Sequence, residues 1–220
     1  SGHTAIYAGS NQLAEAGGAG VIKRVLAGAE TKPEVHQSWK VFRSTNAKLA
    51  GEAAELANDW ASAKLMDYSN FKLVKLGGAI GFNPARALKL GAYAAVNAMP
   101  KNVFCTEFVI SCYQAAAYKG LFDGDLLERL EATVENGSQN DSTKRGENIT
   151  KRKVIKGFLK EEHKVEAEEV EGSLNFDSQN TSPADLEDLL TKAAEKEASE
   201  SGWSSKNTFH EKSLEIPKNP

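Results

Sequence analysis

Cysteine is scarce in this chain: only two occur among 220 residues, Cys105 and Cys112. Two cysteines cannot form the disulfide framework of a small secreted domain. If both lie on one helix, they are too far apart along its axis to bond each other. We therefore expect two reduced thiols, as in a cytosol-like compartment.

Long apolar runs are also absent, because no stretch approaches the roughly 20 apolar residues that cross a bilayer. The chain opens on SGHTAIYAG, without the basic and apolar segments of a signal peptide. We expect a protein without a transmembrane segment or secretory signal, either cytoplasmic or translocated into a host cell as a bacterial effector. The abrupt start is typical of a trimmed domain.

No charge of one sign dominates, because 27 Lys and Arg face 30 Asp and Glu, for a net charge of −3. A nucleic-acid partner is therefore not expected. Residues 142–160 carry seven basic side chains and could touch an anionic membrane surface, but with one aromatic residue and an acidic run behind them a solvated insertion is favoured. Metal-ligand spacings and phosphate-binding glycine loops are missing, so we expect no metal and no other cofactor.

Weak alternation of apolar and polar residues predicts a β-hairpin from strands over 3–8 and 12–16. Further strands are expected over 21–26 and 39–43. Later in the chain, apolar residues recur at intervals of three and four, which indicates amphipathic helices. These helices are expected over 46–63, from Asn83 and Pro84 to Pro100, over 104–119 with Gly120 at the end, and from a capping box of Ser182, Pro183 and Asp185.

The rest of the C-terminal part is polar. Residues 135–152 have few large apolar groups and predict an exposed loop, whereas 153–159 and 163–172 could pair as strands. Residues 191–220 predict a disordered tail. The fold class is therefore expected to be α+β, with helices packed on a small antiparallel sheet in one domain over 1–190.

Cys105 stands at the front of the predicted helix FCTEFVISCYQAAA, residues 104–117. A thiolate at a helix N-terminus is stabilised by unpaired backbone N–H groups and the positive end of the helix dipole. Such a cysteine has a lowered pKa and can act as a nucleophile. The alternative is a buried, inert cysteine, which is the expectation for Cys112 two turns further on.

A catalytic cysteine needs a base, and the chain has four histidines. His36, His163 and His210 lie in polar, charged or tail segments, whereas His3 begins a predicted strand with small and apolar neighbours. A strand holds a general base in a fixed geometry better than a loop does. His3 is therefore the candidate base, and the alternative is an N-terminal histidine that faces solvent.

Glu15 is the candidate for orienting His3. With a three-residue loop over 8–10, Tyr7 would face Asn11 and His3 would face Glu15 across the hairpin. A two-residue loop would instead move Glu15 to the other face. A carboxylate beside the imidazole would fix its tautomer and stabilise the imidazolium; the alternative is an ordinary solvent-facing glutamate.

The segments GHTAIYAGSNQLAEAGGAGV and FCTEFVISCYQAA resemble the circularly permuted papain-like group of the NlpC/P60 superfamily. The likeness is closest to its YiiX/YaeF-type branch and more distant to lecithin:retinol acyltransferase-like proteins, which carry a second histidine where this chain has Glu15. In that group a strand H-x-x-I-Y-x-G carries the base, the next strand orients it, and a helix opening C-[ST]-E-[FL]-V carries the nucleophile. The resemblance covers 3–125 and extends loosely to 190. It implies a papain-like domain with Cys105 as nucleophile and His3 as base.

Two further residues are candidates for contacting substrate. Tyr7 shares a predicted strand face with His3 and could line the site or donate to an oxyanion, although a packed tyrosine is the alternative. Asn102 lies close to Cys105 in sequence but is equally compatible with a turn. The backbone N–H of Cys105 is a further oxyanion donor. Tyr68 resembles a tyrosine of the family's middle segment and is left outside the catalytic set.

The expected function is that of a thiol hydrolase acting on a peptide, amide or lipid-ester substrate. Cys105 would attack the carbonyl carbon, His3 would move the proton, and water would resolve the acyl-enzyme without a cofactor. The same residues could instead transfer a fatty acyl group to a protein or lipid acceptor. A catalytically inactive binding domain is the alternative from another class, which a deeply buried Cys105 with no accessible cleft, or a His3 turned away from it, would favour.

Overall fold

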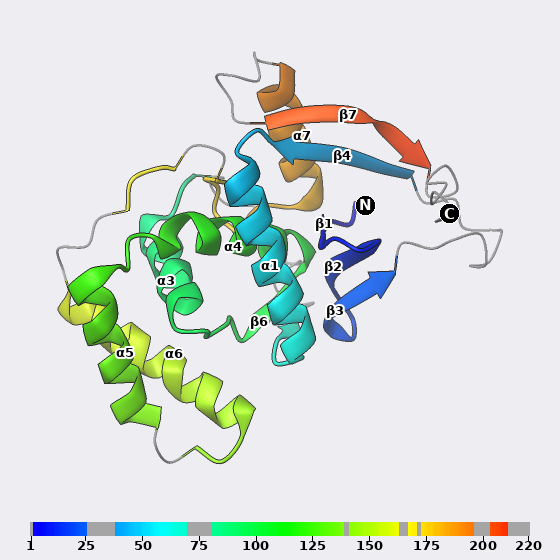
Figure 1. Cartoon of the computed structure of the whole chain (residues 1–220). Helices are drawn as coiled ribbons and strands as arrows, with labels where there is room; N and C mark the ends of the chain where they lie inside the picture. Colours follow the sequence, from blue (N-terminus) through cyan, green and yellow to red (C-terminus); the bar gives the residue numbers. More distant parts are fainter. Residues whose placement is uncertain are drawn as a thin grey trace, which may run out of the picture.

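The computed structural model of the protein describes residues 2–25, 38–69, 81–138, 141–162, 167–170, 173–195 and 203–210, with 38–39 and 203–210 described by their backbone alone. Within these ranges the chain has an α+β fold with six helices and a small antiparallel sheet (Figure 1). The strands are β1 (Ala5–Tyr7), β2 (Gln12–Gly17), β3 (Gly20–Val25), β4 (Ser38–Ser44), β5 (Asp67–Tyr68), β6 (Asn102–Val103) and β7 (Trp203–His210). The helices are α1 (Ala47–Ala63), α3 (Pro84–Ala95), α4 (Cys105–Lys119), α5 (Gly124–Ser138), α6 (Lys144–Glu161) and α7 (Pro183–Glu195).

The described strands form three separate sheets. Strands β1, β2 and β3 form an antiparallel sheet in that order, β4 pairs antiparallel with β7, and β5 pairs parallel with β6. The β1–β3 sheet lies beside α1, whereas α5 and α6 lie at the other end of the molecule (Figure 1). The short β5–β6 pair brings the chain to the start of α4, because β6 ends at Val103.

The β1–β2 hairpin has a three-residue loop, as predicted, but the loop is 9–11 rather than 8–10, and all three of its residues have positive φ. Ala5 consequently pairs with Glu15, and β1 begins at Ala5, so the predicted pairing of His3 with Glu15 within the strands is wrong. Because the loop keeps its length, the shift moves each partner by two residues. Glu15 therefore stays on the predicted face.

Side chains cap several helices where the sequence predicts a helix start. Asn46 caps α1 and Asn83 caps α3, each accepting a hydrogen bond of 3.0 Å from the backbone N–H three residues later. Ser182 and Asp185 form the predicted capping box of α7, with bonds of 3.1 Å in both directions. Helix α3 ends at Ala95, before Pro100, so the proline is not what terminates it.

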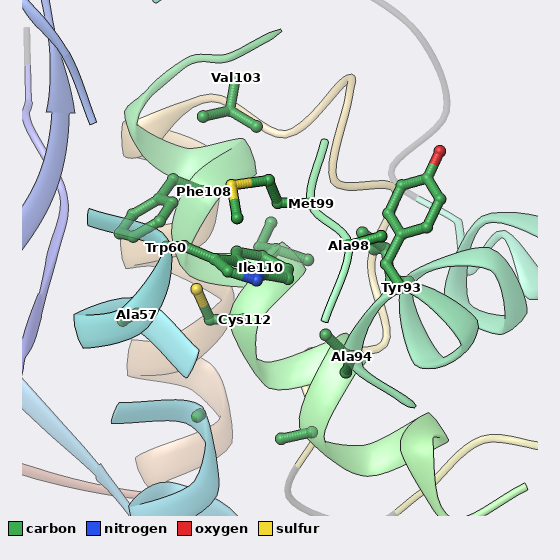
Figure 2. Packing of buried hydrophobic residues seen from close by; sticks show 14 of the residues in the cluster. Ala57, Trp60, Tyr93, Ala94, Ala98, Met99, Val103, Phe108, Ile110 and Cys112 are labelled. Carbon is green, nitrogen blue, oxygen red and sulfur yellow. The ribbon is translucent and has the colours of Figure 1, made fainter. Parts of the chain in front are cut away.

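Helix α4 lies at the centre of the core and is buried on nearly every side. It packs against α3, α1 and the strands β1 and β2. Cys112 is fully buried within this core, where Figure 2 shows it near Ala57, Trp60 and Ile110. The prediction that Cys112 is a core residue is therefore confirmed.

The polar region after α4 is helical, where a loop and a strand are predicted. Residues 135–152 are divided mainly between α5 and α6, and 153–159 continue α6. Asn148, Ile155 and Phe158 are the buried residues of α6, at spacings of seven and three that place them on one helical face. Helix α6 packs on α5 and α3, and Asn148 exchanges hydrogen bonds with the backbone of Met99, so tertiary contacts stabilise a helix that the composition alone does not indicate.

Three smaller expectations also differ from the structure. The predicted strand over 163–172 lies partly outside the described residues, and its described part, 167–170, is not a strand. Within the predicted tail, α7 continues to Glu195 and β7 pairs with β4, while the remaining residues after 195 lie outside the described part. Gly120 follows α4 but has a φ of −64°, so it does not use the left-handed conformation expected of a terminating glycine.

The contact between α3 and α4 depends on the absence of a side chain at Gly91. A Cβ atom there would lie 2.3 Å from the backbone oxygen of Tyr118. We expect Gly91→Ala to lower the free energy of unfolding by about 2–3 kcal/mol, because the backbone of α4 would have to move. Gly51→Ala in α1 is the matched control, since nothing lies within 4 Å of its Cβ position. It should raise the stability by about 0.5–1 kcal/mol through helix propensity, and urea unfolding of both variants measures the difference.

Among the helices that the structure describes, none has both the length and the apolar character needed to span a membrane.

Candidate active site

Cys105 is the first residue of α4, as the sequence predicts. The N-cap position is Phe104, whose side chain makes no capping hydrogen bond. No side chain of the N-cap residue therefore competes for the early backbone N–H groups of α4, and the positive end of the helix dipole favours a thiolate at this position. Cys105 is only 3% exposed, which is the burial that the alternative of an inactive binding domain predicts, whereas His3 is not turned away from it.

His3 lies near the N-terminus, two residues before β1, and its side chain is directed to Cys105. Its imidazole lies close enough to Cys105 for each group to shift the pKa of the other, and its Nε2 atom lies 3.2 Å from Glu15 Oε2. The structure thus brings together all three predicted catalytic residues. His3 and Cys105 are 102 positions apart in the sequence, and the packing of α4 against β1 and β2 brings them together.

Glu15 is placed by the centre strand of the β1–β3 sheet. It is 9% exposed, and its two carboxylate oxygens have different partners. Oε2 faces His3, and Oε1 accepts a hydrogen bond of 3.2 Å from Nε of Arg24 on β3. The alternative of an ordinary solvent-facing glutamate therefore does not describe this side chain.

The electrostatics of the three residues favour an ion pair between sulfur and imidazole. The hydrogen bond to Cys105 and, next, the bond to Glu15 raise the pKa of His3 to about 9. Burial raises the pKa of Cys105, but the bonds from His3 and Thr4 outweigh it and bring that pKa below its usual value. The bond to His3 lowers the pKa of Glu15, against the opposing effect of burial. At neutral pH these shifts favour a thiolate, an imidazolium and a carboxylate in a row.

Thr4 is a site residue that the sequence reasoning missed. Thr4 lies close enough to Cys105 to lower its pKa, and its hydroxyl donates to that of Thr106 over 3.5 Å, while the Thr106 hydroxyl lies 3.9 Å from Cys105 Sγ. These donors stabilise negative charge on the sulfur. The clue available in the sequence is position alone, because Thr4 follows the base and Thr106 follows the nucleophile.

Tyr7 and Asn102, the two candidates for contacting substrate, differ in their surroundings. Tyr7 is 57% exposed, and its hydroxyl accepts a hydrogen bond of 3.3 Å from the backbone N–H of Asn11 at the hairpin loop. It is therefore neither packed, as the alternative had it, nor directed by that bond towards the sulfur. Asn102 lies three residues before Cys105. It is half-buried in β6, where it pairs with Asp67 of β5. Tyr68 follows Asp67 in β5 and pairs with Val103. Burial raises the pKa of Tyr68, and the nearby Cys105 charge raises it further.

Within the described part of the chain, no group of three or more His, Cys, Asp and Glu side chains could hold a metal ion. The chemistry that the three residues can perform is instead nucleophilic. A thiolate can attack an electrophilic carbon, and an adjacent imidazolium can then protonate the leaving group.

Comparison with known proteins finds no relative of this chain: no family model, no curated protein and no solved structure matches it.

Proposed function

We propose that this protein is a thiol hydrolase that cleaves an amide or ester bond through an acyl-enzyme, on a permuted papain-like domain. The observation that carries the proposal is the placement of His3 between Cys105 and Glu15 at the start of α4: His3 and Cys105 shift each other's pKa, and His3 Nε2 lies 3.2 Å from Glu15 Oε2. Nucleophile, base and orienting group stand in the order that this chemistry needs. The resemblance of the HTAIYAG and CTEFV segments to the permuted papain-like group supports the same assignment.

The proposed reaction has two halves. The thiolate sulfur attacks the carbonyl carbon and forms a C–S bond, while negative charge collects on the carbonyl oxygen. The backbone N–H of Cys105 is the proposed donor to that oxygen, with Asn102 as a second candidate. The imidazolium of His3 then gives its proton to the leaving nitrogen or oxygen as the C–N or C–O bond breaks, which leaves a thioester.

In the second half, neutral His3 accepts a proton from water as the water oxygen attacks the thioester carbon. The C–S bond breaks, the carboxylic acid leaves, and the thiolate–imidazolium pair is restored. Glu15 keeps the imidazole oriented and stabilises its charged form in both halves. An amine or alcohol in place of water would give acyl transfer by the same steps.

Selective alkylation tests the nucleophile, with Cys112 as an internal control. We expect iodoacetamide at pH 7 to modify Cys105 at least about tenfold faster than Cys112, because the thiolate is the reactive species. Burial raises the pKa of Cys112 well above its usual value and leaves that thiol fully enclosed. Peptide mass spectrometry over a time course measures both rates.

Equal, slow labelling of both thiols would contradict the proposed function and favour the inactive binding domain. Fast labelling of Cys105 leads to the substrate question. Incubation with peptide, simple ester and phospholipid substrates, followed by intact mass analysis, should trap a thioester on the wild-type chain and none on Cys105→Ala. The trapped mass identifies the acyl group.

A further inference from the structure

Arg24 is a charged neighbour of the three proposed catalytic residues Cys105, His3 and Glu15, which are called the catalytic row below. It lies on β3, and its Nε donates to Glu15 Oε1 over 3.2 Å, while Glu15 Oε2 faces His3. We propose that Arg24 is a positioning residue, which holds the Glu15 carboxylate in the orientation that serves His3. This inference rests on the proposed function above.

The strand register explains why Arg24 and His3 both reach Glu15. Glu15 pairs with Ala5 on β1 and with Ile22 on β3. His3 is two residues before Ala5 and Arg24 is two residues after Ile22, so each is a diagonal neighbour of Glu15 on the same face. Arg24 pairs with Leu13, so it approaches the carboxylate from the β1–β2 loop end of β2 and His3 from the other end.

A carboxylate held at one oxygen only can rotate about its terminal torsion, because this torsion has a broad preference. With Arg24 on Oε1, the other oxygen is held towards the imidazole. The arginine also keeps the carboxylate ionised: it opposes the burial that raises the pKa of Glu15. An ionised, fixed Glu15 in turn stabilises the imidazolium form of His3.

The charged groups that act on this row come from three elements. His3 precedes β1, Arg24 belongs to β3, and both lower the pKa of Glu15. Cys105 acts on His3 from α4. Removal of Arg24 should therefore raise the pKa of Glu15. As a consequence it should lower the pKa of His3 and raise the pKa of Cys105.

A purely structural role for Arg24 predicts something different. If the arginine only stabilised the β2–β3 pairing, its removal would lower the melting temperature without changing the pH at which Cys105 becomes reactive. Lys23 offers a matched control on the same strand. It is exposed, carries the same charge, and donates its Nζ proton to Asn58 Oδ1 on α1 over 3.0 Å instead of facing Glu15.

The experiment measures the rate of Cys105 alkylation by iodoacetamide from pH 4 to 10 in the wild type, Arg24→Met, Arg24→Lys and Lys23→Met. We expect Arg24→Met to raise the midpoint by roughly half a unit to one unit, which lowers the rate below the midpoint about three- to tenfold. Arg24→Lys should recover part of the shift, because it keeps the charge but not the guanidinium geometry. Lys23→Met should leave the midpoint where it is.

A wild-type midpoint in Arg24→Met, or an equal shift in Lys23→Met, would overturn the positioning role while leaving the proposed nucleophile intact. A wild-type protein without reactivity at neutral pH would overturn the proposed function itself. NMR titration of the His3 ring in the same four proteins is a second readout, independent of the thiol. Its pKa, about 9 in the wild type, should fall in Arg24→Met only if Arg24 acts through Glu15.

Discussion

His3→Ala is expected to slow the alkylation of Cys105 at pH 7 by about 100-fold, because a smaller fraction of the thiol is then ionised. Burial raises the pKa of this thiol, and the bond from His3 is the largest effect that lowers it. Without the imidazole, burial prevails and the thiol should stay protonated at neutral pH. Rates measured across pH, with the melting temperature of the variant as a check on folding, give the shift directly.

The reciprocal change provides the control for that result. In Cys105→Ala the pKa of His3 should fall from about 9, because its largest cause is the bond to Cys105. Glu15 still acts on the ring, so the value should stay above that of a free histidine. A folded His3→Ala variant with the wild-type alkylation profile would show that the thiolate does not depend on the imidazole, and the proposed dyad would be lost.

The raised pKa of His3 also determines the pH above which kcat/KM for a substrate should fall. The imidazolium must protonate the leaving group, and its proton is lost as the pH rises through about 9. The thiolate is lost as the pH falls through the lowered pKa of Cys105. We therefore expect a bell-shaped profile of kcat/KM whose alkaline side falls near pH 9.

Glu107→Ala is expected to lower the free energy of unfolding by about 3–5 kcal/mol, the usual cost of leaving one member of a buried ion pair alone. Glu107, in the first turn of α4, has a side chain that is 0% exposed, and its Oε1 accepts a bond of 2.9 Å from Nη2 of Arg86, itself 10% exposed. Arg86 also donates to Ser178, and Gln179 donates to Glu107. The pair therefore joins the starts of α3 and α4 to the segment before α7.

Two controls separate this effect from a general loss of charge. Asp188→Ala removes a partner of Lys192 in a pair whose side chains are both 68% exposed, and it should change the stability by less than about 1 kcal/mol. The double variant Arg86→Met, Glu107→Leu should recover much of the loss, because it leaves no charge buried alone. Urea unfolding measures all three, and a change in Glu107→Ala no larger than that in Asp188→Ala would show that the pair is not stabilising α4.

The sequence predicted helices well where a cap and a periodic apolar face lie close together. Asn46, Asn83 and the Ser182–Asp185 box each satisfy an N–H group within three residues, so the start of a helix can be read from a short window. Helix α6 was missed for the opposite reason. Few of its residues are buried, and it is stabilised by tertiary contacts with α5 and α3 rather than by a local signal.

The hairpin shows how far local reasoning reaches in a sheet. Side chains alternate with a period of two, so the loop length alone places Glu15 on the same face as His3. The position of the loop sets the actual partners, and three consecutive residues with positive φ put it one residue later than predicted. His3 consequently meets Glu15 as a diagonal neighbour beyond the end of β1.

What the sequence determined by itself was the chemistry available: one thiol at a helix start, one histidine in a small and apolar context, and a carboxylate on the neighbouring strand. Which of these groups touch was decided by the tertiary structure, through the packing of α4 against β1 and β2 and the neighbouring strand β3. That packing added Thr4 to the sulfur, and the pairing of β2 with β3 added Arg24 to the carboxylate. The physical reason is range: caps and alternation act over a few residues, whereas a contact between residues 3 and 105 depends on the burial of the core between them.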